Sequence, residues 1–372
     1  MNDPRPPTPV RAATAEDVAA RVAATVRSDV RAMRAYAVAK ADGLIKLDAN
    51  ENPHSLPQEV RNKVAAAIAA VAVNRYPDGA ADDTRAALRR ALGVPDAAGI
   101  VVGTGSDELI QVVTTALASP GAVMLVPEPT FVMYGIYAKL AHLRHVGVPL
   151  RADFKLDAGA MVEAIERDKP ALVWLASPNN PTGTRFDSGA VERVIRAAPG
   201  LVVVDEAYGP FASGTFLPRA LEFPNLVVMG TLSKIGMAGL RLGYVVGHPA
   251  WIAEFDKVRS PYNVNSLTQV AAQTLLAERT LFDEQTAAIR AERARIVAAL
   301  SAMPGVTTFA TEANFVLARV PHAARWFAAL REAGILVKNV HGWHPLLDNC
   351  LRITVGTPAE NVALLAAFGG IK

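Results

Sequence analysis

The chain has 372 residues, of which 51% are hydrophobic and 20% are charged. This length is enough for one large α/β unit with a smaller appended one, and the composition is typical of a globular protein rather than a disordered or fibrous one. The 38 basic and 35 acidic side chains are interleaved and give a net charge of +3, which argues against a nucleic-acid partner.

The single cysteine, Cys350, excludes an intrachain disulfide and a cysteine-rich zinc module, and it indicates a reducing compartment. No segment approaches the roughly 18 consecutive apolar residues that a membrane span requires. Residues 1–22 carry prolines and acids where a secretory signal would be apolar. We therefore expect a cytoplasmic protein without membrane contact, in which residues 1–40 form an extension with a mobile lead and a helical segment.

The next segments predict an arm and a large α/β domain. Residues 41–65 form the arm, because residues 44–53 begin apolar and then carry Asn and Pro, which end a strand. Beyond it lie apolar runs of strand length at 100–102, 122–126, 172–176, 201–204, 226–229 and 242–246. Since these runs do not alternate with polar residues, they are typical of strands buried on both faces. A mostly parallel sheet covered by helices is expected over residues 66–285.

The C-terminal part predicts a smaller domain. One long helical stretch follows Ser266 and ends at Pro304, and we expect it to link two domains. Strands at 314–317 and 351–355 and a helix at 323–333 then indicate a small α+β domain over residues 286–372, to which the arm contributes.

Polar residues follow the apolar runs, where ligands bind in open α/β sheets. The turn at 103–108, GTGSDE, combines two glycines with the start of a helix, whose free N–H groups suit a phosphate. A strand-to-helix turn with a serine cap explains these residues equally well. The turn is no dinucleotide fingerprint, because Glu108 stands where the third glycine belongs.

Three later turns carry further candidates. Residues 177–183, SPNNPTG, hold two carboxamides, and Asp205 ends a buried run, where a carboxylate requires a cationic or hydrogen-bonding partner. Lys234 lies among apolar residues and glycines, which makes it a candidate Schiff-base amine. Turn chemistry, a helix cap and a solvated lysine would each explain one of them. Their order along the chain, with Tyr208 and Arg241 in place, argues against coincidence.

That order resembles the fold type I pyridoxal-phosphate aminotransferases and, within them, the histidinol-phosphate aminotransferase branch. The matching segments, between about residues 44 and 367, are LDANENP, NRYPDG, GTGSDE, SPNNPTG, VVDEAY, TLSK with AGLRLGY, and LRITVGT. The resemblance implies a large domain with a mostly parallel seven-stranded sheet and a smaller α+β domain. It also implies pyridoxal 5′-phosphate as cofactor and amino transfer from L-histidinol phosphate to 2-oxoglutarate, giving imidazole acetol phosphate and glutamate in histidine biosynthesis.

The resemblance implies a role for each catalytic candidate. Lys234 would hold the cofactor covalently and move the proton, and Asp205 would keep the pyridine nitrogen protonated. Asn180 and Tyr208 would hydrogen-bond the phenolic oxygen, and Phe131 would stack on the ring.

Further residues are implied at the cofactor phosphate and the substrate. The phosphate group would be bound by Ser106, Asp107, Glu108, Thr231, Ser233 and Arg241, with Tyr76 supplied by the second subunit of a homodimer. Arg241 follows Lys234 by seven residues where many relatives have eight. The substrate would be bound by Arg352 and Lys338 and lie near Asn52. Lys338 stands where the branch often has arginine, and Asn52 where some relatives carry an aromatic residue.

Several alternatives stay open. An aromatic amino acid aminotransferase and a threonine-phosphate decarboxylase share the cofactor motifs. A non-catalytic pyridoxal-phosphate-binding regulatory domain would require a helix-turn-helix extension, for which roughly 40 residues leave little room. No metal is expected, since His341 and His344 are better explained as loop residues, and Cys350 as a packed small hydrophobe.

Overall fold

The computed structural model describes residues 12–35 and 41–371, and the chain forms two compact units, residues 1–40 and 41–372. The first unit contains α1 (Ala15–Thr25) and α2 (Ser28–Arg31), and Thr14 with Asp17 forms a capping box at the start of α1. The lead predicted to be mobile falls largely on residues 1–11, which lie outside the described residues. None of the described helices is long and apolar enough to cross a membrane.

The second unit contains a seven-stranded sheet in the order β2-β8-β7-β6-β5-β3-β4. Its strands are β2 (Gly99–Thr104), β3 (Val123–Glu128), β4 (Arg144–Pro149), β5 (Leu172–Ala176), β6 (Leu201–Asp205), β7 (Leu226–Thr231) and β8 (Leu242–Gly247). β8 pairs antiparallel with β2 and β7, and the other strand pairs of this sheet are parallel, which confirms the predicted mostly parallel sheet. The edge strand β4 was not predicted, because most of its residues are exposed and it lacks a continuous apolar run.

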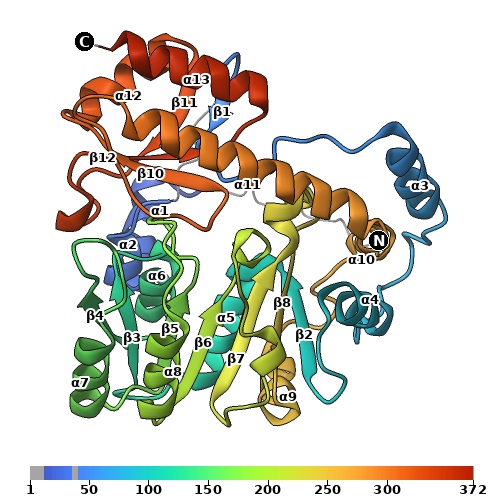
Figure 1. The fold of residues 1–372 in the computed structure, drawn as a ribbon. Helices are drawn as coiled ribbons and strands as arrows, with labels where there is room; N and C mark the ends of the chain where they lie inside the picture. The colour runs from blue at the N-terminus through green and yellow to red at the C-terminus, as the bar shows by residue number, and fades with distance from the viewer. Residues whose placement is uncertain (1–11, 36–40, 372) are drawn as a thin grey trace, which may run out of the picture. The chain divides into compact units, whose positions relative to one another are not determined.

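Helices cover both faces of this sheet, as Figure 1 shows. Val202 and Val204 of β6 face one hydrophobic cluster, whereas Leu201 and Val203 face another. The first cluster is covered by α4 (Asp82–Leu92), α7 (Ala158–Asp168), α8 (Ser188–Ala197) and α10 (Ser266–Leu276). The second is covered by α5 (Gly105–Leu117), α6 (Val132–Leu140) and α9 (Pro249–Val258). Burial on both faces explains the uninterrupted apolar runs of the central strands.

A second, five-stranded sheet joins the arm to the C-terminal part in the order β1-β11-β12-β10-β9. Its strands are β1 (Ile45–Leu47), β9 (Thr307–Thr308), β10 (Phe315–Arg319), β11 (Ile335–Asn339) and β12 (Cys350–Thr354). The arm strand β1 pairs in parallel with β11, so residues from the start and the end of this unit share one sheet. Its core includes residues of α12 (Ala323–Glu332) and α13 (Pro358–Gly370).

The long helical stretch expected after Ser266 is present, but it is divided into two helices. The chain forms α10 and then α11 (Arg279–Ser301), with a break at residues 277–278. Leu275 and Leu276 of α10 pack in the core of the large sheet, whereas Ile289 and Ile296 of α11 pack in the core of the small one. The break lets the chain change direction between the two cores, and no Pro or Gly marks it in the sequence.

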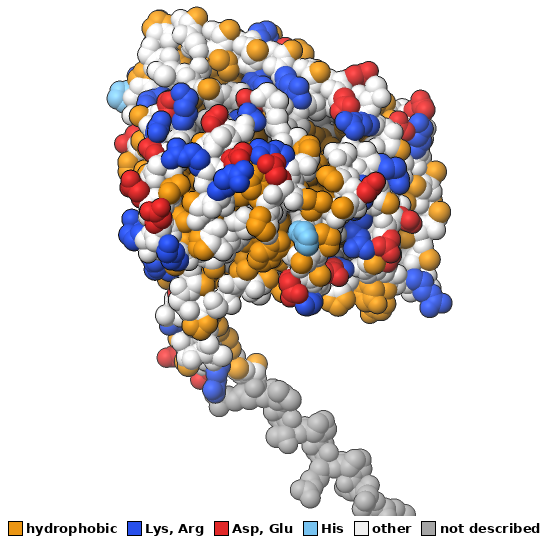
Figure 2. Space-filling view, turned by 60° about the horizontal axis from the view of Figure 1, so that its bottom comes forward, with side chains coloured by type: hydrophobic (Ala, Val, Ile, Leu, Met, Phe, Trp, Pro, Cys, Tyr) orange, Lys and Arg blue, Asp and Glu red, His pale blue; other side chains and the backbone are white. Residues whose placement is uncertain are grey.

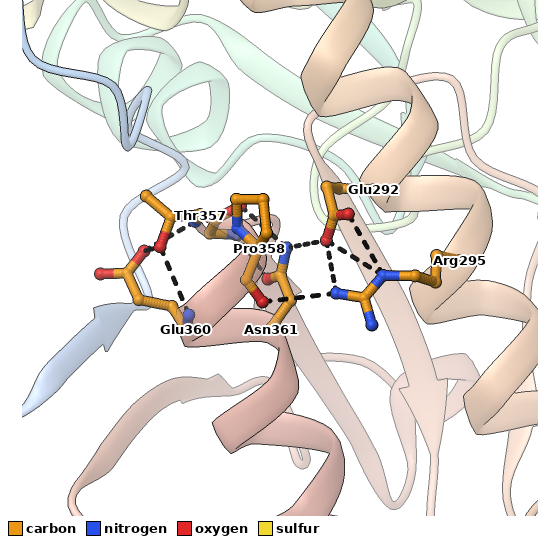
Figure 3. A network of polar contacts seen from close by, with 7 residues as sticks. Glu292, Arg295, Thr357, Pro358, Glu360 and Asn361 are labelled. Atoms are coloured by element: carbon orange, nitrogen blue, oxygen red, sulfur yellow. Dashed lines mark hydrogen bonds and ion pairs between the residues drawn. The ribbon is translucent and has the colours of Figure 1, made fainter.

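Polar contacts attach α13 to α11 beside the end of β12 (Figure 3). The Asn361 amide donates to Glu292 Oε2 over 2.7 Å, and the same carboxylate pairs with Arg295. Thr357 and Glu360 form a capping box at the start of α13. Elsewhere on the surface, Figure 2 shows Lys, Arg, Asp and Glu side chains interspersed, as the near-balanced charge predicts.

Candidate active site

Three neighbouring strands end at one edge of the large sheet. β6 ends at Asp205, β5 runs into the turn at 177–183, and β7 runs into the short helix Leu232–Ile235 that carries Lys234. β6 lies between β5 and β7, and all three are parallel. The carboxylate, the carboxamide turn and the lysine therefore meet at the carboxyl end of the sheet, as expected for a ligand site.

Asp205 is a buried carboxylate with two neutral donors. Its Oδ1 accepts the N–H of Ala207 over 2.9 Å, and its Oδ2 accepts the hydroxyl of Tyr134 over 2.5 Å. Tyr134 is fully buried and stacks on Trp174 with ring centroids 4.8 Å apart. Burial raises the pKa of Asp205 from 3.8 to about 6, so a cationic group beside it would stabilise the charged form.

Tyr134 was not predicted from the sequence. It lies one helical turn after Phe131, whose ring meets it edge-on with centroids 5.7 Å apart. That spacing is the only signal the sequence offers, because the contact with Asp205 joins residues 71 positions apart.

Lys234 is half-buried and reaches the arm. Its Nζ lies 3.4 Å from the Ala49 carbonyl oxygen and 5.8 Å from the ring centroid of Tyr208. Burial and the nearby Arg352 cation lower the pKa of Lys234 from 10.5 to about 8. A larger fraction of this amine is therefore neutral and nucleophilic near neutral pH than of an ordinary lysine.

Donors converge at the start of α5. The first N–H groups of a helix have no partner within it, and Ser106 and Asp107 lie in this first turn. The Arg241 guanidinium lies 3.3 Å from Asp107 Oδ2 and 3.5 Å from the Ser233 hydroxyl, which in turn lies 2.9 Å from that of Thr231. Backbone amides, hydroxyls and a guanidinium together suit an anion.

A glycine permits this convergence. Gly105 has φ +77°, and a Cβ there would lie 2.6 Å from Arg241 Nη2. Glu108 lies in the same turn, but its carboxylate accepts the Thr104 N–H and the Asn263 amide. Those contacts close the turn internally, and a role of Glu108 in cofactor binding stays a prediction.

Arg352 of β12 is buried and contacts both the turn and the arm. Its Nη1 donates to Asn180 Oδ1 over 2.6 Å, and its Nη2 donates to the Asp48 carbonyl oxygen over 2.7 Å. Lys338 of β11 pairs with Arg352 across the antiparallel ladder, and its Nζ lies 5.8 Å from the ring centroid of Trp343. Directly opposed residues share one sheet face, so two cations project to the same side.

Three consecutive arm residues thus contact three of the predicted site side chains. The Asp48 carbonyl accepts from Arg352, the Ala49 carbonyl from Lys234, and the Asn50 amide donates to the Tyr208 hydroxyl over 2.9 Å. Asn50 was not singled out from the sequence, although it lies within LDANENP.

The remaining predicted residues have other neighbours. Asn52 donates to Gln285 Oε1 of α11 over 2.9 Å. Tyr76 is 82% exposed and stacks on Tyr262 with ring centroids 4.7 Å apart. The roles of Asn52, Tyr76 and Phe131 stay predictions.

The two candidate histidines stabilise the loop in which they lie. Nδ1 of His341 accepts the N–H of Asn349, and Nδ1 of His344 accepts that of Leu346. Cys350 is buried in the hydrophobic core.

These residues fit pyridoxal 5′-phosphate at three points. The start of α5 with Arg241 suits the phosphate, and Gly105 allows the guanidinium to lie against this turn. Lys234 supplies a primary amine with a lowered pKa for the aldehyde. Asp205 supplies a buried carboxylate for the ring nitrogen, and Asn180 and Tyr208 supply polar groups for the phenolic oxygen.

Comparisons with known proteins agree with this geometry. The family model "Aminotransferase class I and II" matches residues 42–368. A histidinol-phosphate aminotransferase of Chromobacterium violaceum is 56% identical over 92% of this chain and 96% of its own length. Histidinol-phosphate aminotransferase 1 of Ralstonia nicotianae is 53% identical over 92% of this chain and 93% of its own. The crystal structure of histidinol-phosphate aminotransferase from Sinorhizobium meliloti in complex with pyridoxal-5′-phosphate superposes with a TM-score of 0.82 at 26% identity, covering 92% of this chain and 96% of that one.

Proposed function

This chain belongs to the class I and II aminotransferases, and we propose that it transfers the amino group of L-histidinol phosphate to 2-oxoglutarate. The products are imidazole acetol phosphate and glutamate, which makes the reaction a step of histidine biosynthesis. Its cofactor is pyridoxal 5′-phosphate. The name shared by relatives more than half identical to this chain supports the proposed substrate.

The observation that carries the substrate proposal is the cation pair on the small sheet. Lys338 and Arg352 are direct partners in the β11–β12 ladder. A phosphate monoester carries nearly two negative charges near neutral pH, so it gains more than a single carboxylate from two adjacent cations. Arg352 alone offers the planar fork that also suits a carboxylate of 2-oxoglutarate.

The residues around the cofactor have complementary tasks. When bound, pyridoxal phosphate withdraws electrons from the carbon that carries the amino group, which makes that C–H bond acidic. The Lys234 amine moves the proton, and its lowered pKa suits this exchange. Asp205 holds a proton at the ring nitrogen, while Asn180 and Tyr208 orient the ring through its phenolic oxygen.

Steady-state kinetics with competing donors test the proposal. The cofactor-loaded protein is assayed with 2-oxoglutarate and L-histidinol phosphate, L-phenylalanine or L-threonine phosphate. We expect kcat/KM for histidinol phosphate to exceed that for phenylalanine by at least about tenfold, because the second cation strengthens phosphate binding by about 1.4 kcal/mol or more. A higher kcat/KM for phenylalanine, or release of carbon dioxide from threonine phosphate, would contradict it.

We further propose a homodimer in which Tyr76 reaches the cofactor phosphate of the other subunit. Three apolar side chains support such a contact, since Val73 is 78%, Tyr76 82% and Tyr262 47% exposed. Mixing Lys234→Ala chains with Tyr76→Ala chains would create one intact site in each mixed dimer. Recovered activity at limiting cofactor supports the shared site, and no recovery on verified mixed dimers contradicts it.

A cytoplasmic location is part of the same proposal. The only cysteine is buried and unpaired, as suits a reducing compartment.

A further inference from the structure

We propose that Asn50 is a positioning residue that makes the Tyr208 hydroxyl a hydrogen-bond donor toward the cofactor. The inference rests on the proposed function, because it takes Tyr208 to face the phenolic oxygen of pyridoxal phosphate. It goes beyond that function by assigning the arm a part in tuning the cofactor.

Asn50 is held from three sides. It is 1% exposed and has φ +56°, a left-handed conformation that asparagine tolerates better than most residues. Its backbone N–H donates to Thr354 Oγ1 over 3.0 Å, and its carbonyl oxygen accepts the Asn314 amide over 2.9 Å. Its side chain lies between Thr354 of the small sheet and Tyr208, which follows β6 of the large sheet. The residue therefore has little freedom to turn.

The hydrogen bonds also fix which end of the Asn50 amide faces Tyr208. Thr354 Oγ1 accepts the backbone N–H of Asn50, so its own hydrogen is available to Asn50 Oδ1, 3.2 Å away. The amide oxygen thus faces Thr354 and the NH2 group faces the Tyr208 hydroxyl at 2.9 Å. A flipped amide would take away the Asn50 oxygen that accepts the Thr354 hydrogen, and would leave Tyr208 with an acceptor instead of a donor.

The direction of the hydrogen bonds from Thr354 through Asn50 to Tyr208 decides whether the Tyr208 hydroxyl can donate to the cofactor. Since the Tyr208 oxygen accepts from Asn50, its hydrogen is left for another acceptor. The phenolic oxygen of the cofactor is the acceptor that the proposed function places there. A donor to that oxygen stabilises its anion and so lowers the pKa of the bound chromophore.

Charged groups also act on Tyr208, and the variants must leave them in place. They are Arg352 on β12, Lys234 after β7, Asp205 on β6 and Asp107 on α5. The Asn50 side chain hydrogen-bonds Tyr208 and Thr354, which are both uncharged. Substitution of Asn50 therefore changes the direction in which the Tyr208 hydroxyl donates its hydrogen, without removing a charge.

The test is a pH titration of the visible absorbance of the cofactor-loaded enzyme. Tyr208→Phe sets the scale and should raise the midpoint by roughly one to two pH units, as expected for a lost hydrogen bond to a charged group. Asn50→Asp reverses the hydrogen bond between residue 50 and Tyr208, because its carboxylate accepts the Tyr208 hydrogen. This variant should raise the midpoint by a similar amount. Asn50→Gly keeps the left-handed backbone and removes the amide, and should give a smaller rise.

Two controls isolate the effect of orientation. Asn50→Asp in the Tyr208→Phe background measures the effect of the added charge on the midpoint. The part of the Asn50→Asp shift that exceeds this charge effect should be absent there, because the Tyr208 hydroxyl is gone. Asn349→Asp is the matched control, because Asn349 is also left-handed, with φ +57°, and its side chain accepts only the Ala323 N–H in the bonds described. It should titrate like the unaltered enzyme.

The outcomes separate the two proposals. If Tyr208→Phe leaves the midpoint unchanged, the proposed placement of the cofactor fails and this inference fails with it. If Tyr208→Phe raises the midpoint and both Asn50 variants do not, only the inference is overturned. Should the Asn50 variants not fold, Thr354→Val removes the hydroxyl that orients the amide, and it must raise the midpoint for the inference to stand.

Discussion

The two sides of the candidate site are built differently. On the large-sheet side, Asp205 is the last residue of β6 and Lys234 lies in the short helix after β7, so two buried parallel strands place them at one edge. On the arm side, the side-chain contacts join distant parts of the chain: Asn50 to Thr354 across 304 residues, and Asn52 to Gln285 across 233. The groups for the cofactor's amine and ring nitrogen therefore come from the sheet edge itself, whereas the positions of Tyr208 and Arg352 depend on how the arm packs between the two sheets.

Lys234→Ala should have the largest effect, because it removes the amine on the sheet side. We expect amino transfer to fall by at least about 10³-fold, through loss of both the covalent attachment and the proton carrier. Rapid-mixing assays of the loaded protein measure it, with circular dichroism as the folding control. A variant that still transfers amino groups at a tenth of the normal rate would contradict this role.

Asp205→Asn should abolish most activity and change how the stability of the cofactor-free protein depends on pH. We expect kcat to fall by about 100-fold or more, because an amide does not hold the ring nitrogen protonated. The folded pKa of Asp205, about 6, lies above its ordinary value of 3.8, so the folded state binds more protons between these values. Stability contributed by this group is therefore lost as pH rises from about 4 to about 6.

The Asp205→Asn variant does not lose stability in this way, because its amide does not ionise. Relative to the unaltered protein, its free energy of unfolding should rise by on the order of 2–3 kcal/mol between about pH 4 and pH 8. Urea unfolding of both cofactor-free proteins at the two pH values measures the difference. A relative stability independent of pH would show that Asp205 is not the buried acid described.

Arg352→Lys tests the arm side. Its two guanidinium nitrogens donate to Asn180 and to the Asp48 carbonyl, a pair that one ammonium group does not reproduce. We expect KM to rise by about 30- to 100-fold for both histidinol phosphate and 2-oxoglutarate, with a smaller change in kcat. A change confined to kcat would contradict a role of Arg352 in substrate binding and would indicate a role in the chemical step.

Lys338→Met separates the two substrates. Because methionine keeps the apolar stem and removes the charge, KM for histidinol phosphate should rise by about tenfold while that for 2-oxoglutarate changes little. Equal changes for both substrates would show that Lys338 does not discriminate the phosphate.

Asn52→Ala should have the smallest effect. The Asn52 amide is engaged by Gln285, so its removal should lower the free energy of unfolding by about 1 kcal/mol and change KM less than threefold. Thermal unfolding and donor kinetics check this. A tenfold rise in KM would show that Asn52 takes part in substrate binding.

The sequence predicted the sheet side better than the arm side, for physical reasons. Continuous apolar runs indicated the central strands, and turn residues after them indicated Asp205 and Lys234. The edge strand β4 lacked that pattern, and the break before α11 carries no Pro or Gly. Tyr134 and Asn50 act through contacts between distant residues, which a single sequence does not reveal without the fold.

The most direct test of the account is a visible-absorbance titration of the purified, cofactor-loaded protein with L-histidinol phosphate and, separately, L-phenylalanine. Each donor should convert the absorbance band of the bound cofactor if it is accepted. The account predicts conversion by histidinol phosphate at a concentration at least about tenfold lower, since only this donor uses both cations. Conversion by phenylalanine at the lower concentration, or a loaded protein without a visible band, would contradict it.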